Sequence, residues 1–198
     1  MPETILFPYD PTWPETFSQM CAVYTATLER LIVTIEHVGS TAVPGLLAKP
    51  ILDIDIVIPT RDALPEVTAR LEALGYRHNG NQGIPEREVF KANDTAAPYT
   101  EPRQVWMAHH LYVCHAESAE LQRHLQFRDA LRRSPELCAE YTRLKEETEQ
   151  AAQGDRKVYA HLKEGICRAF VEQVLETRKR DFNELTAFFS RDTTAAYR

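Results

Sequence analysis

The chain lacks any apolar run approaching the roughly 20 residues that a membrane-spanning helix requires. Its first residues, Met-Pro-Glu-Thr, lack the basic and apolar regions of a signal peptide. It has only four cysteines, far apart and with no CxxC pair, so disulfides and a structural zinc site are not expected. These absences predict a cytoplasmic protein with reduced thiols and no membrane partner.

Basic residues are fewer than acidic residues. Lysine and arginine number 23 against 29 acidic residues, which gives a net charge of -6. This balance argues against an obligate nucleic-acid binder, which normally carries a basic surface. The length of 198 residues suits one structural unit with a substantial core. Within that unit we expect an α/β core over residues 1–116 and a C-terminal helical segment over residues 117–198.

Hydrophobic periodicity predicts an α+β fold, a mixed sheet flanked by helices. One helix is expected to begin at Thr12, acting as its cap, and a second at Thr60. Later helices follow Ser118, Ser134 and Gly154. Strands are expected at residues 31–38, 51–58, 88–91 and 104–115, the last two antiparallel.

The most informative strand contains two acids. Alternation places Asp53 and Asp55 on one face, roughly 7 Å apart, with aliphatic residues on the other. Two carboxylates on a mostly buried strand lose hydration and repel each other unless a cation compensates. Mg²⁺ or Mn²⁺ suits such a pair. The alternative is that this face is simply exposed to solvent, but Ile51 and Val57 flank the acids and favour a cleft.

A Gly39-Ser40 turn precedes the acidic strand. Glycine lets a ligand approach the backbone, and turn amides with a hydroxyl suit a phosphate chain. Lys49, placed between turn and strand, is expected to neutralise phosphate charge. Taken singly, such a pair is usually a plain turn and such a lysine is usually solvated.

The amino-acid sequence around the turn and the acidic strand is distinctive. The run EHVGSTAVPGL from Glu36 to Leu46, followed by AKPI and the acidic strand, resembles the GrpB family. Shorter motifs near the start and in the later helices fit the same family, so that the resemblance covers residues 3–175. It implies the nucleotidyltransferase fold of the DNA polymerase β type, with Asp53 and Asp55 as catalytic metal ligands. The resemblance also suggests that the basic helical residues approach the cleft, and His37 and His110 are candidates because their strands lie near it. The full set of candidate substrate-binding residues is Gly39, Ser40, Thr41, Lys49, His37, His110, Arg128, Lys145, Tyr159 and Lys163.

Two departures from the pattern bear on function. Tyr112 stands where the family often has a second histidine, and no clear third carboxylate accompanies the pair, although Glu88 is a candidate. The leading hypothesis is therefore a metal-dependent nucleotidyltransferase with an unknown acceptor. The alternative is a non-catalytic module that binds a nucleotide or a CoA-like molecule. For the basic helical residues, an ordinary solvated surface with i,i+4 pairs also stays open.

The C-terminal tail carries an apolar pattern, formed by Phe182, Leu185, Phe188 and Phe189. This spacing gives one apolar face on a short helix, which must dock to be stable. It is expected to dock on its own domain or, alternatively, on a second copy in a homodimer.

Overall fold

The computed structural model describes residues 4–195, and the side chains in that range except those of 178, 179 and 181–195. Its centre is a five-stranded sheet in the order β1-β2-β5-β4-β3. The strands are β1 (Thr34–Val38), β2 (Leu52–Ile58), β3 (Tyr76–His78), β4 (Arg87–Ala92) and β5 (His109–His115). β2 and β5 pair in parallel, and all other neighbours are antiparallel. The predicted α+β class with a mixed sheet is confirmed.

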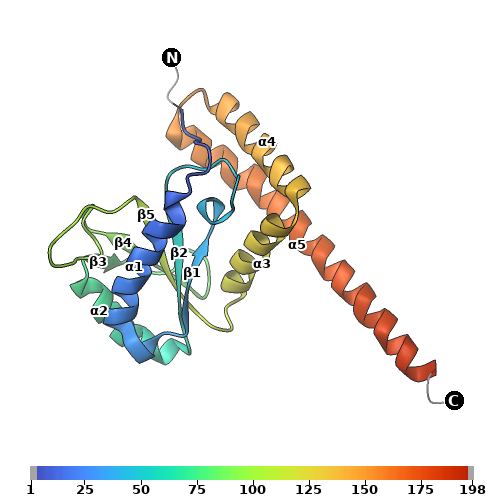
Figure 1. Cartoon of the computed structure of the whole chain (residues 1–198), viewed down its shortest axis with the longest axis horizontal. Helices are drawn as coiled ribbons and strands as arrows, with labels where there is room; N and C mark the ends of the chain where they lie inside the picture. The colour runs from blue at the N-terminus through green and yellow to red at the C-terminus, as the bar shows by residue number, and fades with distance from the viewer. Residues whose placement is uncertain (1–3, 196–198) are drawn as a thin grey trace.

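One face of the sheet is covered by α1 (Thr12–Leu28) and α2 (Leu64–Ala73), as Figure 1 shows. Leu52, Ile54, Ile56 and Ile58 of β2 point toward these helices and are almost completely buried. They form the main core with side chains from both helices and from β5. Since the even-numbered residues of β2 enter this core, its odd-numbered residues face the other side.

The opposite face of the sheet is covered in part by α3 (Ala119–Arg133), whose Leu121 packs with Val57 and Cys114. Two further helices follow, α4 (Pro135–Ala152) and α5 (Arg156–Ala195). They pack on α3 through a separate apolar cluster that includes Tyr141 and Phe170. In Figure 1 α5 runs alongside α4 and continues past α3 toward the C-terminus. The boundary at residue 116 stays a prediction, and the tail side chains from Phe182 to Phe189 lie outside the described residues.

Several predicted boundaries were wrong. The strand expected at 104–115 begins only at His109, because Trp106 turns inward and its indole Nε1 donates to the Pro98 carbonyl at 2.8 Å. The short strand β3 was missed. Thr12 does not cap α1; the Asp10 carboxylate accepts from the Thr12 backbone N–H at 2.8 Å. Among the described residues, no helix combines the length and apolarity needed to cross a bilayer.

Candidate functional site

The two acids of β2 lie on the sheet face that looks toward α3. Asp53 is paired with Val38 of β1 and His110 of β5, and Asp55 is in register with Tyr112. The Asp55 side chain is 0% exposed and that of Asp53 is 30% exposed. The common face is therefore as predicted, and the alternative of a simply solvated face is wrong for Asp55.

Each acid has a histidine partner. His110 Nδ1 lies 2.9 Å from Asp53 Oδ1, and His124 Nδ1 of α3 lies 2.7 Å from Asp55 Oδ2. His124 also contacts Glu120 through Nε2 at 3.2 Å. His110 was predicted at the site but His124 was not. The only sequence signal for His124 was its spacing of four residues from Glu120, which places both on one helix face.

These partners decide the charge of the pair. Burial raises the pKa of Asp53, but the hydrogen bond from His110 and the charges of His110, Lys163 and His124 outweigh it, so the pKa is lowered. Burial keeps the pKa of Asp55 raised in spite of the hydrogen bond from His124. Burial lowers the pKa of His124, but its bonds to Asp55 and Glu120 prevail and raise it to about 9. His124 is therefore an imidazolium at neutral pH and compensates Asp55.

One oxygen of each acid is not used by histidine. Asp55 Oδ1 is buried and has no hydrogen-bond partner. Asp53 Oδ2 lies against Gly39. An orphaned, buried carboxylate oxygen beside a second carboxylate fits a hard divalent cation that keeps several waters. Within the described part of the chain, no group of three or more His, Cys, Asp or Glu side chains could hold a metal, so a cation bound here would take at most two of its ligands from such side chains.

Glu88 does not supply the third carboxylate. It pairs with Val113, a core residue on the α1 and α2 face, and its side chain contacts His78 Nε2 at 2.7 Å. It therefore points away from the acids. Glu36 does lie on the acidic face, opposite Asp55, but it accepts from Arg128 Nη1 at 2.7 Å.

The Gly39-Ser40 turn after β1 packs closely against the Asp53 carboxylate. Gly39 has φ of +69°, and a Cβ there would overlap the Asp53 carboxylate, with the Cγ only 2.9 Å away. Ser40 Oγ accepts from Lys145 Nζ at 2.7 Å, and the same ammonium donates to the Leu47 carbonyl at 2.6 Å. The turn thus brings a hydroxyl and a lysine of α4 to the edge of the acidic pair.

Lys145 is only 1% exposed. Burial, with the charge of Lys163, lowers its pKa to about 7. Burial and the charges of Lys163 and Arg156 also lower the pKa of Lys49. Lys163 thus lies near both Lys49 and Lys145, and the charges of Lys145 and Lys163 lie close to Asp53. The mutual repulsion of these lysines marks a place where an anion is favoured.

Several predicted substrate-binding residues make their contacts with other groups of the protein, away from the acidic pair. Lys49 Nζ lies 4.3 Å from the centre of the buried Tyr159 ring, so that ring face is taken by a cation. His37 Nε2 bonds to Thr41 Oγ1 at 3.0 Å, and the His37 ring stacks on Phe17 of α1. Both His37 and Thr41 thus lie off the acidic face.

Arg128 forms ion pairs with Glu36 and Asp129, which leave its positive charge largely compensated.

Known sequences are similar to this chain over most of its length. The family model described as "GrpB protein" matches residues 3–175. UPF0157 protein BH1888 from Halalkalibacterium halodurans is 33% identical over 175 residues, covering 87% of this chain and 83% of that protein. UPF0157 protein YqkA from Bacillus subtilis is 30% identical over 139 residues, but the chain spans only 38% of its length. A dephospho-CoA kinase from Mycolicibacterium paratuberculosis is 26% identical in an alignment of 184 positions that covers 80% of this chain and 43% of the kinase.

Solved structures agree with the fold. The crystal structure of the conserved protein GrpB from Enterococcus faecalis has a TM-score of 0.71 and 26% identity, covering 88% of this chain and 99% of that one. A mutant of the Cid1 poly(U) polymerase bound to MgATP has a TM-score of 0.51 at 11% identity, covering 78% and 50%. The second likeness concerns the fold alone, and it confirms the nucleotidyltransferase-like architecture.

Proposed function

The chain belongs to the GrpB family, and we propose that it binds a nucleoside triphosphate with Mg²⁺ and transfers the nucleotidyl group to a hydroxyl acceptor. One observation carries this proposal. An acidic pair, each member with an oxygen that no histidine uses, lies directly beside a Gly-Ser turn that holds a buried lysine. Carboxylates for a cation and donors for phosphates therefore meet at one edge of the sheet.

Each residue has a distinct role in this proposal. Asp53 and Asp55 would hold the cation through the two oxygens that histidine does not use. When bound, Mg²⁺ supplies neutralisation of the charge that develops on the phosphate oxygens. Ser40 and Lys145 would bind the terminal phosphates, with Lys49 and Lys163 adding positive charge nearby. Because the pKa of Lys145 is about 7 without an anion, a bound phosphate would also favour its protonated form.

Binding without transfer is a second candidate, and one observation favours it. In the described residues the neighbouring strand presents His110 and Tyr112 beside the acids, and Glu88 points to the other face. A site with two acids can hold a Mg²⁺–nucleotide complex without the third ligand that active nucleotidyltransferases use. A CoA-like ligand stays within this alternative, since the chain is also similar to part of a dephospho-CoA kinase.

Calorimetry and a nucleotide screen would test the proposal. Titration of Mg²⁺ or Mn²⁺ into the wild-type protein should give binding that the double variant Asp53→Asn, Asp55→Asn abolishes. Glu88→Gln is the matched control, because it removes an acid on the opposite sheet face and should leave metal affinity unchanged. Unchanged affinity in the double variant would contradict the metal assignment.

The phosphate contacts need their own test. A thermal-shift screen of the four nucleoside triphosphates and CoA, with and without Mg²⁺, should show stabilisation that requires the metal. Ser40→Ala and Lys49→Ala should each weaken nucleotide binding by roughly 1–3 kcal/mol, as for loss of a hydrogen bond to a charged group. Lys157→Ala, at an exposed position of α5, is the control. Pyrophosphate release would establish transfer, whereas binding without release would support the second candidate.

A further inference from the structure

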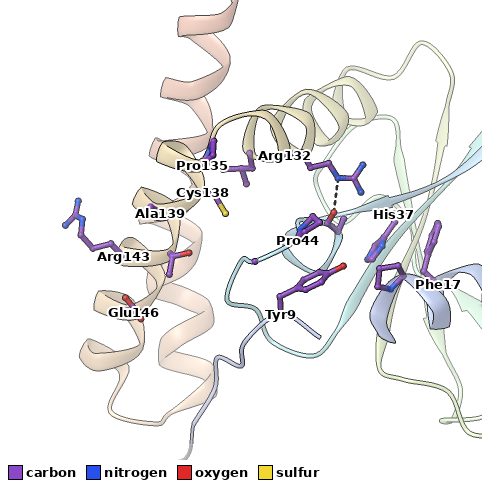
Figure 2. Close-up of a pocket in the computed structure, with 15 residues that line it drawn as sticks. Tyr9, Phe17, His37, Pro44, Arg132, Pro135, Cys138, Ala139, Arg143 and Glu146 are labelled. Carbon is purple, nitrogen blue, oxygen red and sulfur yellow. Dashed lines mark hydrogen bonds between the residues drawn. The ribbon is translucent and has the colours of Figure 1, made fainter. Parts of the chain in front are cut away.

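A cavity lies on the side of the turn after β1 that faces away from the acidic pair. Its volume is about 850 Å³, within the range of small-molecule sites. The lining comes from the N-terminal segment, α1, β1, the loop after β1, α3 and α4, as Figure 2 shows. The residues that matter for its chemistry are Tyr9, Phe17, His37, Pro44, Leu131 and Arg132.

This cavity is separate from the acidic pair. The two are divided by the short 3-10 turn Ser40–Ala42 and the residues after it. Ser40 at the start of the turn accepts from Lys145 beside the acids, whereas Ala42, Pro44 and Gly45 line the cavity. The acids Asp53 and Asp55 take no part in the lining. Occupation of the cavity therefore does not require a nucleotide or a metal.

The walls are flat and mostly apolar. Phe17 and His37 stack with ring centres 4.7 Å apart and planes 16° from parallel. Burial is the main reason that the pKa of His37 is lowered to about 4, so its ring is neutral at physiological pH. Tyr9, Pro44 and Leu131 add further apolar surface. A planar, apolar group of a ligand can be desolvated favourably against such surfaces.

One side chain gives the cavity a positive charge. Arg132 Nε donates to the Ala42 carbonyl at 2.9 Å, which fixes the guanidinium at the cavity wall. The nearby carboxylates of Glu36 and Asp129 are paired with Arg128, and within the described part of the chain no carboxylate lies at ion-pair distance from Arg132. By contrast, Arg143 is paired with Glu147 at 2.6 Å and points away from Arg132 in Figure 2. The guanidinium of Arg132 therefore keeps donors for an anion.

We propose that this cavity binds a small, flat aromatic molecule that carries one acidic group. The rings lie against the Phe17–His37 stack and Pro44, and the acidic group accepts from Arg132. Planarity is selected by the stacked walls, and the negative charge by the unpaired guanidinium. Glu146, also in the lining, disfavours a second acidic group by repulsion.

A pair of fluorescent probes tests both features. Anilinonaphthalene sulfonate is an aromatic anion, and N-phenyl-naphthylamine has the same ring frame without the acid. Titrated into the full chain, the sulfonate should bind at one site at least tenfold more tightly than the neutral probe. Arg132→Gln keeps a donor for the Ala42 carbonyl and should remove that preference. Arg133→Gln is the matched control, because the next residue of α3 lines a different, smaller cavity.

A steric variant checks the location. Ala139 is exposed on α4 and lines the cavity, so Ala139→Trp should fill the space without disturbing a core. It should weaken both probes at least tenfold while circular dichroism stays unchanged. Equal affinity of the two probes for the wild-type protein would overturn the assignment of an anionic ligand. Sulfonate binding that survives both Arg132→Gln and Ala139→Trp would overturn the site itself.

Discussion

Replacing His124 with glutamine should destabilise the folded protein, most strongly below pH 7. The imidazolium of His124 is held between Asp55 at 2.7 Å and Glu120 at 3.2 Å. Glutamine can still donate one hydrogen bond, but it carries no charge. Asp55, which is fully buried, is then left without its compensating cation.

The size of the effect follows from the pKa of His124. The rise from 6.5 in an unfolded chain to about 9 in the fold corresponds to roughly 3 kcal/mol of stability at low pH. The side chain is 21% exposed, and its two carboxylate partners titrate with it, so we expect about 2 kcal/mol for the variant.

The pH window has a definite sign. Because the folded pKa is raised, the contribution of His124 is fully present below pH 6.5 and is lost as the pH rises through about 9. Lys145 acts oppositely, since its pKa of about 7 makes the fold gain stability between pH 7 and 10.5. The difference between wild type and variant cancels the contribution of Lys145 and isolates that of His124.

Urea unfolding in the presence of EDTA at pH 6, 7.5 and 9.5 gives the required free energies. The difference between wild type and His124→Gln should be largest at pH 6 and should shrink toward zero at pH 9.5. A difference that stays constant over this range would refute the charged pair, because a loss of packing alone does not depend on the proton. A variant as stable as wild type at pH 6 would refute it equally.

Two further predictions concern the turn and the core. Gly39→Ala should lose at least about 2 kcal/mol of unfolding free energy and weaken metal binding, whereas Gly45→Ala should lose only about 1 kcal/mol. Both glycines have positive φ, but only at position 39 would a Cβ meet Asp53, so urea unfolding of the pair separates contact from backbone strain. Tyr76→Phe should lose about 2 kcal/mol in thermal or urea unfolding, because the Tyr76 hydroxyl lies 2.6 Å from both the Tyr24 hydroxyl and His109 Nε2 in the core. A loss below 0.5 kcal/mol would contradict that chain of hydrogen bonds.

Much of the architecture was predictable because it depends on local patterns. Alternation in residues 52–58 determines which residues of β2 enter the core, and so fixes Asp53 and Asp55 on the common opposite face. The glycine at position 39 marked the tight turn, and the capping serines marked the starts of α3 and α4. The long segment before His109 was misread because its polar and apolar residues carry no information about which of them turn inward.

The electrostatics of the site were decided only by tertiary structure. The face on which Glu88 lies depends on the register of β4 against β5, and a shift of one residue would have reversed it. His124 reaches Asp55, 69 positions away in sequence, because α3 crosses the acidic face. Lys145 likewise meets Ser40 across 105 positions, through the packing of α4 against the turn. The sequence by itself determined which face carries the acids and where the turn lies. The packing of helices on the sheet decided which charges compensate those acids, because such contacts have no periodicity along the chain.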